Sequence, residues 1–399
     1  MVDLDFVREA ADRIAGRVAR TPLIRSEFLS RQVGGDIWLK LDTLQVTGAF
    51  KERGAANRLA LLTPTERAAG VVAISAGNHA QAVARHASLL GIRAVIVMPA
   101  ATPSSKVSRT AGWGAEVVLH GSTLIEAADH ARVLAAAEGL SFIHPYDDDA
   151  IIAGQGTMAL EIVEQAPMLD RMAVPLGGGG LLAGCIAGVR AAPRPVRVFG
   201  VEVESYAAFT QALAGEKINV GGMTIAEGIA VQDIGAKPLE MIRASGTDVL
   251  TVSEHAIEDA IALLAEEAKL IAEGAGAAGV AAVLAFPELF RNGHTAIPIC
   301  GANIDNRALA NVLQRVMVRD GRLLRLVFDI PDRPGILGDI ATRIGGAGAN
   351  IIEVSHHRLF TSPDAKSARL EVMIEARDAA HGARVVALLE ESFSLTVLE

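Results

Sequence analysis

Short apolar runs alternate with longer Ala-rich segments over residues 36–320. The runs favour β-branched residues and often end at Gly or Pro, which is typical of strands bounded by turns. Segments such as 79–91, 124–139 and 255–274 instead predict helices. This alternation predicts an α/β fold with parallel sheets, and uniformly apolar strands predict burial on both faces. The predicted strands include DIWLKLD, VVAISA, RAVIVMP, AEVVLHG, RMAVPL, VRVFGVE, DVLTVS and TAIPICG.

The pattern changes over the last 75 or so residues. LLRLVFDI, ILGDIATRIGGAG, NIIEVSHHRL, SARLEVMIEA, DAAHGARVVALLEES and SLTVLE read in that order as βαββαβ. This order predicts a ferredoxin-like domain over 323–399, preceded by the connection VMVRDGR. The remaining domain, 1–320, is predicted to have a small lobe at approximately 45–150 and a second lobe assembled from both flanks.

Composition narrows the function classes. The net charge of −9 and the lack of a Lys/Arg-rich run argue against nucleic-acid and membrane-surface partners. The N-terminus reads as an acidic amphipathic helix, and no apolar run reaches the roughly 20 residues of a membrane helix, so we expect a cytoplasmic protein. Cys185 and Cys300 lie far apart with no His pair nearby, which predicts reduced thiols without a disulfide or zinc site.

A run of four glycines is the strongest single motif. Gly177, Gly178, Gly179 and Gly180, followed by Leu181, lie between a predicted strand and a predicted helix. Consecutive glycines let backbone N–H groups converge on a phosphate at a helix N-terminus. The run matches neither G-x-G-x-x-G nor a P-loop, so the phosphate is expected on a smaller ligand than a dinucleotide or triphosphate.

Four further motifs allow two interpretations each. Lys51, in TGAFKERG, is either catalytic or solvated, and the loop SAGNHAQ at 75–81 either holds an anion or is a plain turn with Asn as a cap. PICGAN at 298–303 either meets a heterocycle or contains only a buried cysteine. The glycines of EGAGA at 273–277 either suit a close backbone approach or mark a helix break.

Together these motifs resemble the fold-type II pyridoxal-phosphate (PLP) enzymes, specifically the threonine and serine dehydratase branch, over residues 5–320. The resemblance implies a two-lobed, tryptophan synthase β-like fold with PLP as cofactor. It also implies a lyase that converts a small hydroxy-amino acid, in the first place L-threonine, to an oxo acid and ammonia. In the family the acid that assists the leaving hydroxyl is thought to be the cofactor phosphate.

The resemblance assigns roles to individual residues. Lys51 matches the Schiff-base lysine and catalytic base, although Ala49 replaces the family's Ser. Cys300 matches the small residue at the pyridine nitrogen, where a neutral group leaves the ring unprotonated. The implied cofactor contacts are Phe50, Lys51, Asn78, Gly177, Gly178, Gly179, Gly180, Leu181 and Cys300, and the implied substrate contacts are Ser75, Ala76, Gly77, Asn78 and His79.

Two departures sharpen this interpretation. Serine racemases of the family use a second Ser where this chain has Ala76, which disfavours racemisation. Relatives often hold a divalent cation with a Glu and an Asp six residues later, whereas Glu202 is followed at that spacing by Ala208. No metal site is therefore expected.

The tail resembles an ACT domain, with Asp332-Arg333-Pro334-Gly335 as the turn before its first helix. ACT domains usually pair and bind amino acids near this turn, which implies an effector such as isoleucine or valine. A domain that only mediates assembly is the alternative. A homodimer or homotetramer is expected. The implied effector contacts are Gly335, Ile336, Leu337, Asn350 and Ile351.

Three alternative functions stay open. Within the family, the substrate could be serine or 3-hydroxyaspartate. Outside it, the chain could be an amino-acid-sensing regulator without catalysis, which the intact Lys51 and Asn78 disfavour. An NAD-dependent oxidoreductase would need G-x-G-x-x-G followed by an acidic residue, which the chain lacks.

Overall fold

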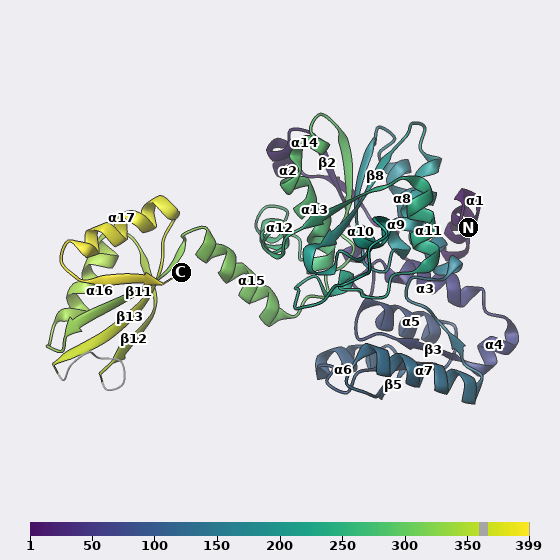
Figure 1. Cartoon of the computed structure of the whole chain (residues 1–399), viewed down its shortest axis with the longest axis horizontal. Helices are drawn as coiled ribbons and strands as arrows, with labels where there is room; N and C mark the ends of the chain where they lie inside the picture. The colour runs from purple at the N-terminus through teal and green to yellow at the C-terminus, as the bar shows by residue number, and fades with distance from the viewer. Residues whose placement is uncertain (359–365, 399) are drawn as a thin grey trace. The chain divides into compact units, whose positions relative to one another are not determined.

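The computed structural model describes residues 1–358 and 366–398. They divide into two compact units, Met1–Asp305 and Asn306–Glu399, each with its own hydrophobic core. The first unit contains two sheets and the second contains one. Figure 1 shows the strands and helices of both units with their labels.

The larger sheet has six strands in the order β1-β2-β10-β7-β8-β9. Neighbours from β2 to β9 pair in parallel, and the short edge strand β1 pairs antiparallel with β2. This sheet therefore combines β1 and β2, which precede the smaller sheet in the sequence, with β7, β8, β9 and β10, which follow it. The bounds are β1 Leu23–Arg25, β2 Asp36–Lys40, β7 Arg171–Pro175, β8 Arg197–Val203, β9 Asp248–Val252 and β10 His294–Pro298.

The smaller sheet is parallel throughout, with the order β5-β4-β3-β6. Alternate residues of its central strands pack against α5 on one face and α7 on the other, and Figure 1 shows these helices on opposite sides of β3. Burial on both faces explains the uniformly apolar sequences of β3 and β4. The bounds are β3 Val71–Ile74, β4 Ala94–Met98, β5 Glu116–Leu119 and β6 Ser141–Phe142.

Side-chain caps and glycines fix many helix ends. Thr123 accepts a hydrogen bond from the backbone N–H of Glu126 at the start of α7, and Gly139 ends that helix in the left-handed region. The α-helices of the first unit are α1 Leu4–Ile14, α2 Glu27–Val33, α3 Lys51–Ala60, α4 Pro64–Ala69, α5 Asn78–Leu89, α6 Ser104–Gly112, α7 Leu124–Glu138, α8 Asp149–Gln165, α9 Gly180–Gly188, α10 Ala208–Leu213, α11 Ala236–Ser245, α12 Glu254–Glu266, α13 Gly274–Ala285 and α14 Pro287–Phe290.

One predicted helix is too long. The helix expected over 255–274 ends at Glu266, and a new helix, α13, begins at Gly274. Lys269, between them, has a φ of 57°, which no right-handed helix accommodates. The backbone N–H of Leu270 turns back to the carbonyl of Leu264. A hydrogen bond outside the helical pattern thus interrupts a segment whose composition suits a helix throughout.

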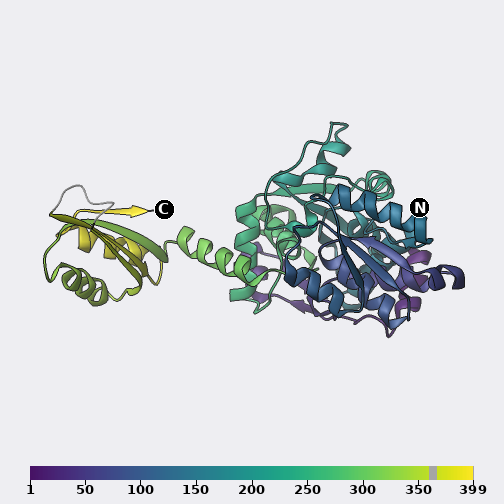
Figure 2. The same cartoon turned by 90° about the horizontal axis from the view of Figure 1, so that it is seen from below.

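The second unit begins with α15 and continues as βαββαβ, as predicted. Its sheet is antiparallel with the order β12-β13-β11-β14. Residues of β13 alternate between buried and half-buried, because α16 and α17 cover one face of the sheet (Figures 1 and 2). The bounds are α15 Asn306–Arg319, β11 Leu323–Pro331, α16 Ile336–Gly346, β12 Asn350–His357, β13 Ser367–Glu375, α17 Ala379–Glu390 and β14 Leu395–Leu398.

The connection VMVRDGR is partly helical, because α15 continues to Arg319. Within the described residues, no helix combines the length and the apolar character that crossing a membrane requires.

Candidate active site

The predicted site segments follow the carboxyl ends of parallel strands. Gly177 comes after β7, Cys300 after β10 and Ser75 after β3. Open α/β sheets bind ligands at this edge, because the helix N-termini there present free backbone N–H groups. The chain thus brings its small and polar loops to the end of the sheets where a small molecule is expected.

Lys51 is the first residue of α3, directly after the N-cap residue Phe50. Its Nζ donates a hydrogen bond to the carbonyl of Pro145 at 2.8 Å and lies 5.3 Å from the centre of the Phe50 ring. Burial lowers the pKa of Lys51 to about 8, although the nearby Cys300 and Glu273 act in the opposite direction. A lysine with this pKa has a large neutral fraction in mildly alkaline solution, as a nucleophile or general base requires.

The segment before Lys51 is anchored to the strand end that contains Cys300. Ala49 forms an antiparallel bridge with Gly301, and the N–H of Phe50 donates to the carbonyl of Cys300 at 2.9 Å. Just beyond, the buried guanidinium of Arg53 pairs with the buried carboxylate of Asp42 at 2.6 Å. These contacts fix the position of Lys51 relative to Cys300.

The four glycines are required by close contacts. A Cβ on Gly178 would lie 2.2 Å from Cδ1 of Tyr146, and one on Gly180 would lie 3.0 Å from the Cα of Tyr146. Gly179, the N-cap of α9, has a φ of 91°. Tyr146 directly follows Pro145, whose carbonyl receives Lys51. The glycine loop, with the free N–H groups of a helix N-terminus, therefore lies beside the lysine, and a phosphate fits there.

The loop between β3 and α5 is not a turn that Asn78 caps. The N-cap position belongs to Gly77, and the side chain of Asn78 makes no capping bond. Its Nδ2 instead donates to Oε1 of Glu273 at 2.7 Å, and its Oδ1 accepts from Nδ2 of Asn303 at 2.8 Å. Ser75 accepts a bond from the N–H of Gly77, and this residue stretch stays partly exposed. The expectation that Asn78 caps the helix is therefore wrong, whereas anion binding by this loop stays a prediction.

His79 differs from its neighbours because it is buried. Its Nε2 lies 3.0 Å from the carbonyl oxygen of Ile143. Burial, together with the positive charge of Lys51, lowers the pKa of His79 to about 3. The imidazole is therefore neutral at physiological pH and does not act as an acid there.

Cys300 is 2% exposed, and its Sγ lies 3.8 Å from the carbonyl oxygen of Ala275. Burial raises the pKa of this thiol well above its usual range, with a further contribution from Glu273. The thiol is thus neutral, which suits a pyridine nitrogen that carries no proton. A Cβ on Gly276 would lie 2.5 Å from the carbonyl oxygen of Gly301, so the glycines of α13 allow a close backbone approach, and they directly follow the break between α12 and α13.

Sequence reasoning missed three residues. Tyr146 gave no signal, because its role depends on contact with the glycine loop. The sequence shows Asn303 only as the end of a strand motif, yet its Nδ2 also donates to the carbonyl of Thr47 at 2.7 Å. Glu273 shows no signal beyond the glycines that follow it. All three connect segments far apart in the chain, so local pattern could not identify them.

The residues predicted to bind an effector lie in the second unit. Gly335 is the N-cap of α16 with a φ of 97°, and Ile336 and Leu337 begin that helix. Asn350 and Ile351 begin β12, where Nδ2 of Asn350 donates to Glu375 at 3.4 Å. The turn and the strand start therefore belong to one ferredoxin-like unit.

Glu202 is engaged inside the protein. Its carboxylate accepts hydrogen bonds from the N–H groups of Phe209 and Thr210 at 2.7 and 2.9 Å. It therefore completes the N-terminus of α10. Among the residues with described positions, no cluster of three or more His, Cys, Asp or Glu side chains could hold a metal ion.

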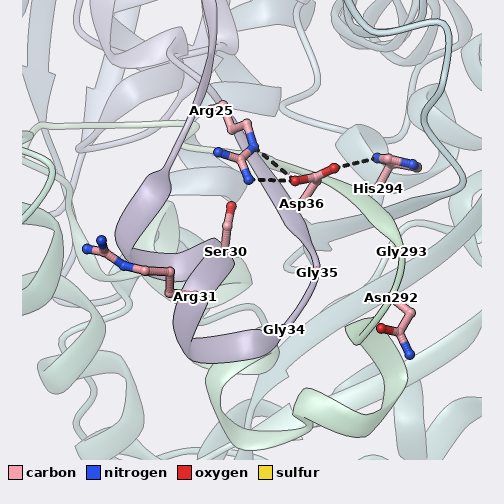
Figure 3. A pocket seen from close by; sticks show the side chains of 9 residues that line it. All are labelled: Arg25, Ser30, Arg31, Gly34, Gly35, Asp36, Asn292, Gly293 and His294. Atoms are coloured by element: carbon pink, nitrogen blue, oxygen red, sulfur yellow. Dashed lines mark hydrogen bonds and ion pairs between the residues drawn. The ribbon is translucent and has the colours of Figure 1, made fainter.

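A separate hollow of about 450 Å³ lies at the amino ends of β2 and β10, away from the carboxyl ends that carry the predicted site. Asp36 and His294, the first residues of β2 and β10, line it together with Arg25 (Figure 3). Asp36 lies 2.7 Å from Nη2 of Arg25 and 3.0 Å from Nδ1 of His294. Asp36 thus pairs with two of the basic residues that line this hollow, and the hollow contains none of the predicted site residues.

Comparison with known proteins gives a consistent result. The family model described as "Pyridoxal-phosphate dependent enzyme" matches residues 14–301. An L-threonine ammonia-lyase of Thermotoga maritima is 39% identical over 384 residues, covering 96% of this chain and 95% of the relative. The processed threonine deaminase isoform 2 of Solanum lycopersicum has a TM-score of 0.74 at 32% identity, covering 79% of this chain and 87% of its own. Maize serine racemase has a TM-score of 0.74 at 33% identity, covering 80% and 98%.

Proposed function

The chain belongs to the family of pyridoxal-phosphate-dependent enzymes, and from this membership we propose that it is an L-threonine ammonia-lyase. It converts L-threonine to 2-oxobutanoate and ammonia by β-elimination of water, with possible turnover of L-serine. The observation that carries the proposal is the 39% identity over 96% of this chain to a relative of that name. Two features of the site support it: Lys51 is partly neutral, and the thiol of Cys300 is neutral.

PLP supplies, when bound, the electron sink that makes the Cα–H of an amino acid acidic. Lys51 binds the cofactor and then removes the Cα proton at its Nζ, which burial keeps partly neutral. The neutral thiol of Cys300 would meet the ring nitrogen, and Phe50 would pack against the ring. N–H groups of Gly177, Gly178, Gly179, Gly180 and Leu181 would hold the phosphate.

The loop after β3 binds the substrate. Ser75, Ala76 and Gly77 would surround the carboxylate of the amino acid at the start of α5, where a helix N-terminus favours negative charge. Asn78 contacts the cofactor. His79 is buried and neutral, and its bond to the carbonyl of Ile143 holds the start of α5 in place.

Racemisation is disfavoured although a serine racemase has a similar fold. The side chain of Ala76 carries no group that could donate or accept a proton. An ammonia-lyase for serine or 3-hydroxyaspartate is the alternative within the family, since a carboxylate loop does not select the substrate side chain.

The test is the visible spectrum of the purified full-length protein with PLP, recorded before and after L-threonine is added, with 2-oxo acid and ammonia assayed in parallel. We expect absorbance of lysine-bound PLP and faster release of 2-oxobutanoate from threonine than of pyruvate from serine. Lys51→Ala should lose both the absorbance and the turnover. Lys237→Ala, which removes an exposed lysine paired with Asp149, should keep both.

The outcomes separate the parts of the proposal. Bound PLP without turnover of threonine or serine would indicate that the substrate is another hydroxy-amino acid. Full turnover by Lys51→Ala would contradict the role of Lys51, and no absorbance even with added PLP would contradict the cofactor assignment.

We further propose that the domain over 323–399 is an ACT domain that binds isoleucine or valine as an effector. The βαββαβ order and the left-handed Gly335 before α16 support this assignment. Catalysis then belongs to residues 1–320. A cytoplasmic location and a homodimeric or homotetrameric assembly complete the proposal, since symmetric oligomers are the commonest state of such enzymes.

A further inference from the structure

Glu273 contacts the proposed cofactor machinery but has no role in it so far. It precedes α13, and its N–H donates to the carbonyl of Gly301 at 3.0 Å. Its Oε1 accepts a hydrogen bond from Nδ2 of Asn78 at 2.7 Å. Glu273 therefore contacts a residue that the proposed function assigns to PLP.

This contact fixes the orientation of the Asn78 amide. Nδ2 of Asn303 donates both to Oδ1 of Asn78 and to the carbonyl of Thr47. The oxygen of Asn78 therefore faces Asn303, and its nitrogen faces Glu273. An amide nitrogen carries two hydrogens, so one N–H of Asn78 stays available for a ligand after the bond to Glu273.

Backbone packs closely against one side of the Glu273 carboxyl group, and the residue as a whole is half-buried. A Cβ on Gly301 would lie 2.3 Å from its Oε1, and one on Gly228 would lie 3.5 Å from the same atom. Burial raises the pKa of Glu273 to about 7, against the effect of the bond from Asn78. Unlike an exposed carboxyl group, Glu273 thus exchanges its proton near neutral pH.

The charged groups around this carboxyl and around Lys51 are few in the described part of the chain. Glu227 raises the pKa of Glu273 and Lys106 lowers it, and these two side chains pair with each other at 2.6 Å. A negative charge on Cys300 or on Glu273 would raise the pKa of Lys51. The thiol is neutral, as is the buried His79, and burial also lowers the pKa of His144. Glu273 is therefore the neighbour of Lys51 whose charge changes near neutral pH.

We propose that Glu273 is a positioning residue for the reaction: it orients Asn78, and by gaining or losing a proton it sets the fraction of Lys51 that is neutral. This inference rests on the proposed function, in which Lys51 reacts as a neutral amine. Ionised Glu273 favours the ammonium form of Lys51, and protonated Glu273 favours the neutral form. A variant without this charge should contain neutral Lys51 at lower pH.

The test uses Glu273→Gln in the full-length chain, because Gln keeps an oxygen for the bond from Asn78 and removes the charge. The rate at which PLP-depleted protein captures added PLP is measured against pH by visible absorbance, since only the neutral amine attacks the aldehyde. We expect the midpoint to shift to lower pH by roughly half a unit or more. The acidic limb of the kcat/KM profile for threonine should shift in the same direction.

Two further variants separate charge from shape. Glu273→Asp keeps the charge but shortens the side chain, so it should keep the wild-type midpoint and bind PLP more weakly. Glu227→Gln removes a largely exposed carboxylate next to the same site, and it should cause no shift to lower pH.

An unmoved midpoint in Glu273→Gln, or equal shifts in the Gln and Asp variants, would overturn the inference. Failure of the wild-type protein to capture PLP or to turn over threonine would instead contradict the proposed function. The two failures are thus distinguishable.

Discussion

At the scale of single residues, surroundings decide chemistry more than residue type does. Burial lowers the pKa of Lys51, whereas a hydrogen bond to Asp149 raises that of the exposed Lys237. The same contrast separates Glu273, whose pKa rises on burial, from Glu66, whose pKa is lowered by hydrogen bonds from Thr63. Reactive groups therefore arise where the fold removes water without supplying a full counter-charge.

His79 leads to a prediction about stability and pH. Its pKa in the folded protein, about 3, lies below the ordinary value of 6.5. As the pH falls below 6.5, the unfolded chain takes up a proton that the folded protein does not, so stability present above that pH is lost. Between about pH 7.5 and about pH 5.5, this effect should cost about 1.4 kcal/mol of unfolding free energy.

The measurement is urea unfolding of the PLP-free protein at both pH values. His79→Gln, which does not titrate, should show a smaller loss of stability on acidification than the wild type. The matched control is His255→Gln, which replaces an exposed histidine and should retain the wild-type loss. An equal loss in wild type and His79→Gln would contradict the assignment of a buried neutral imidazole.

At the scale of elements, the glycine loop and α9 form one unit, for which we propose phosphate binding. The loop contacts Tyr146 from a different part of the chain, and the helix presents its N-terminus where the loop ends. The absence of side chains at Gly178 and Gly180 allows Tyr146 to support the loop directly. Close packing therefore explains the glycines at these two positions.

Gly178→Ala should weaken PLP binding. Its new methyl group would clash with the ring of Tyr146, because Cδ1 lies 2.2 Å from the Cβ position. Overpacking of this kind typically costs about 1–3 kcal/mol, so we expect PLP to bind about 5- to 150-fold more weakly. Equilibrium titration with PLP, followed by absorbance, measures the change.

Two comparisons isolate the clash. Gly112→Ala, at an open helical position of the same unit, should leave PLP affinity unchanged. Adding Tyr146→Ala to Gly178→Ala should restore part of the affinity if the ring causes the loss. Wild-type affinity in Gly178→Ala would show that the loop can move away from Tyr146 without cost.

At the scale of the whole molecule, the residues proposed for catalysis and those proposed for effector binding fall in different units. The residues proposed for catalysis all lie in Met1–Asp305, and those proposed for effector binding all lie in Asn306–Glu399. Each unit contains its own buried core. Regulation would therefore require that effector binding in one unit changes substrate binding in the other. Such coupling is reciprocal, because the substrate then changes the affinity for the effector by the same factor.

Isoleucine or valine should bind to the full-length protein and change its threonine kinetics. Calorimetric titration measures the binding, and threonine turnover with and without the amino acid measures the coupling. Asn350→Ala, at the start of β12, should reduce the heat of binding, whereas Gly346→Ala, at an open position late in α16, should retain it. No heat and no kinetic change in the wild type would favour a domain that only mediates assembly.

The sequence by itself determined the order of strands and helices, the fold class and the main motifs. Apolar patterning and turn residues act over a few positions, so the predicted strands match the observed ones to within about three residues at each end, whereas the short strands β1 and β6 are not predicted. The lysine motif and the glycine loop are also short, and the resemblance that they carry to a known family identified the cofactor class. The end of α12 escaped this reasoning, since its composition stays helical beyond Glu266.

Only the tertiary structure decided which groups meet. Asn78 contacts Glu273 and Asn303 across 195 and 225 positions of the chain, and Lys51 meets Pro145 across 94. Such contacts depend on how strands order themselves within the sheets, which no local pattern specifies. Shifted pKa values follow from the same packing, because the removal of water around a carboxyl or amine is a property of the assembled core.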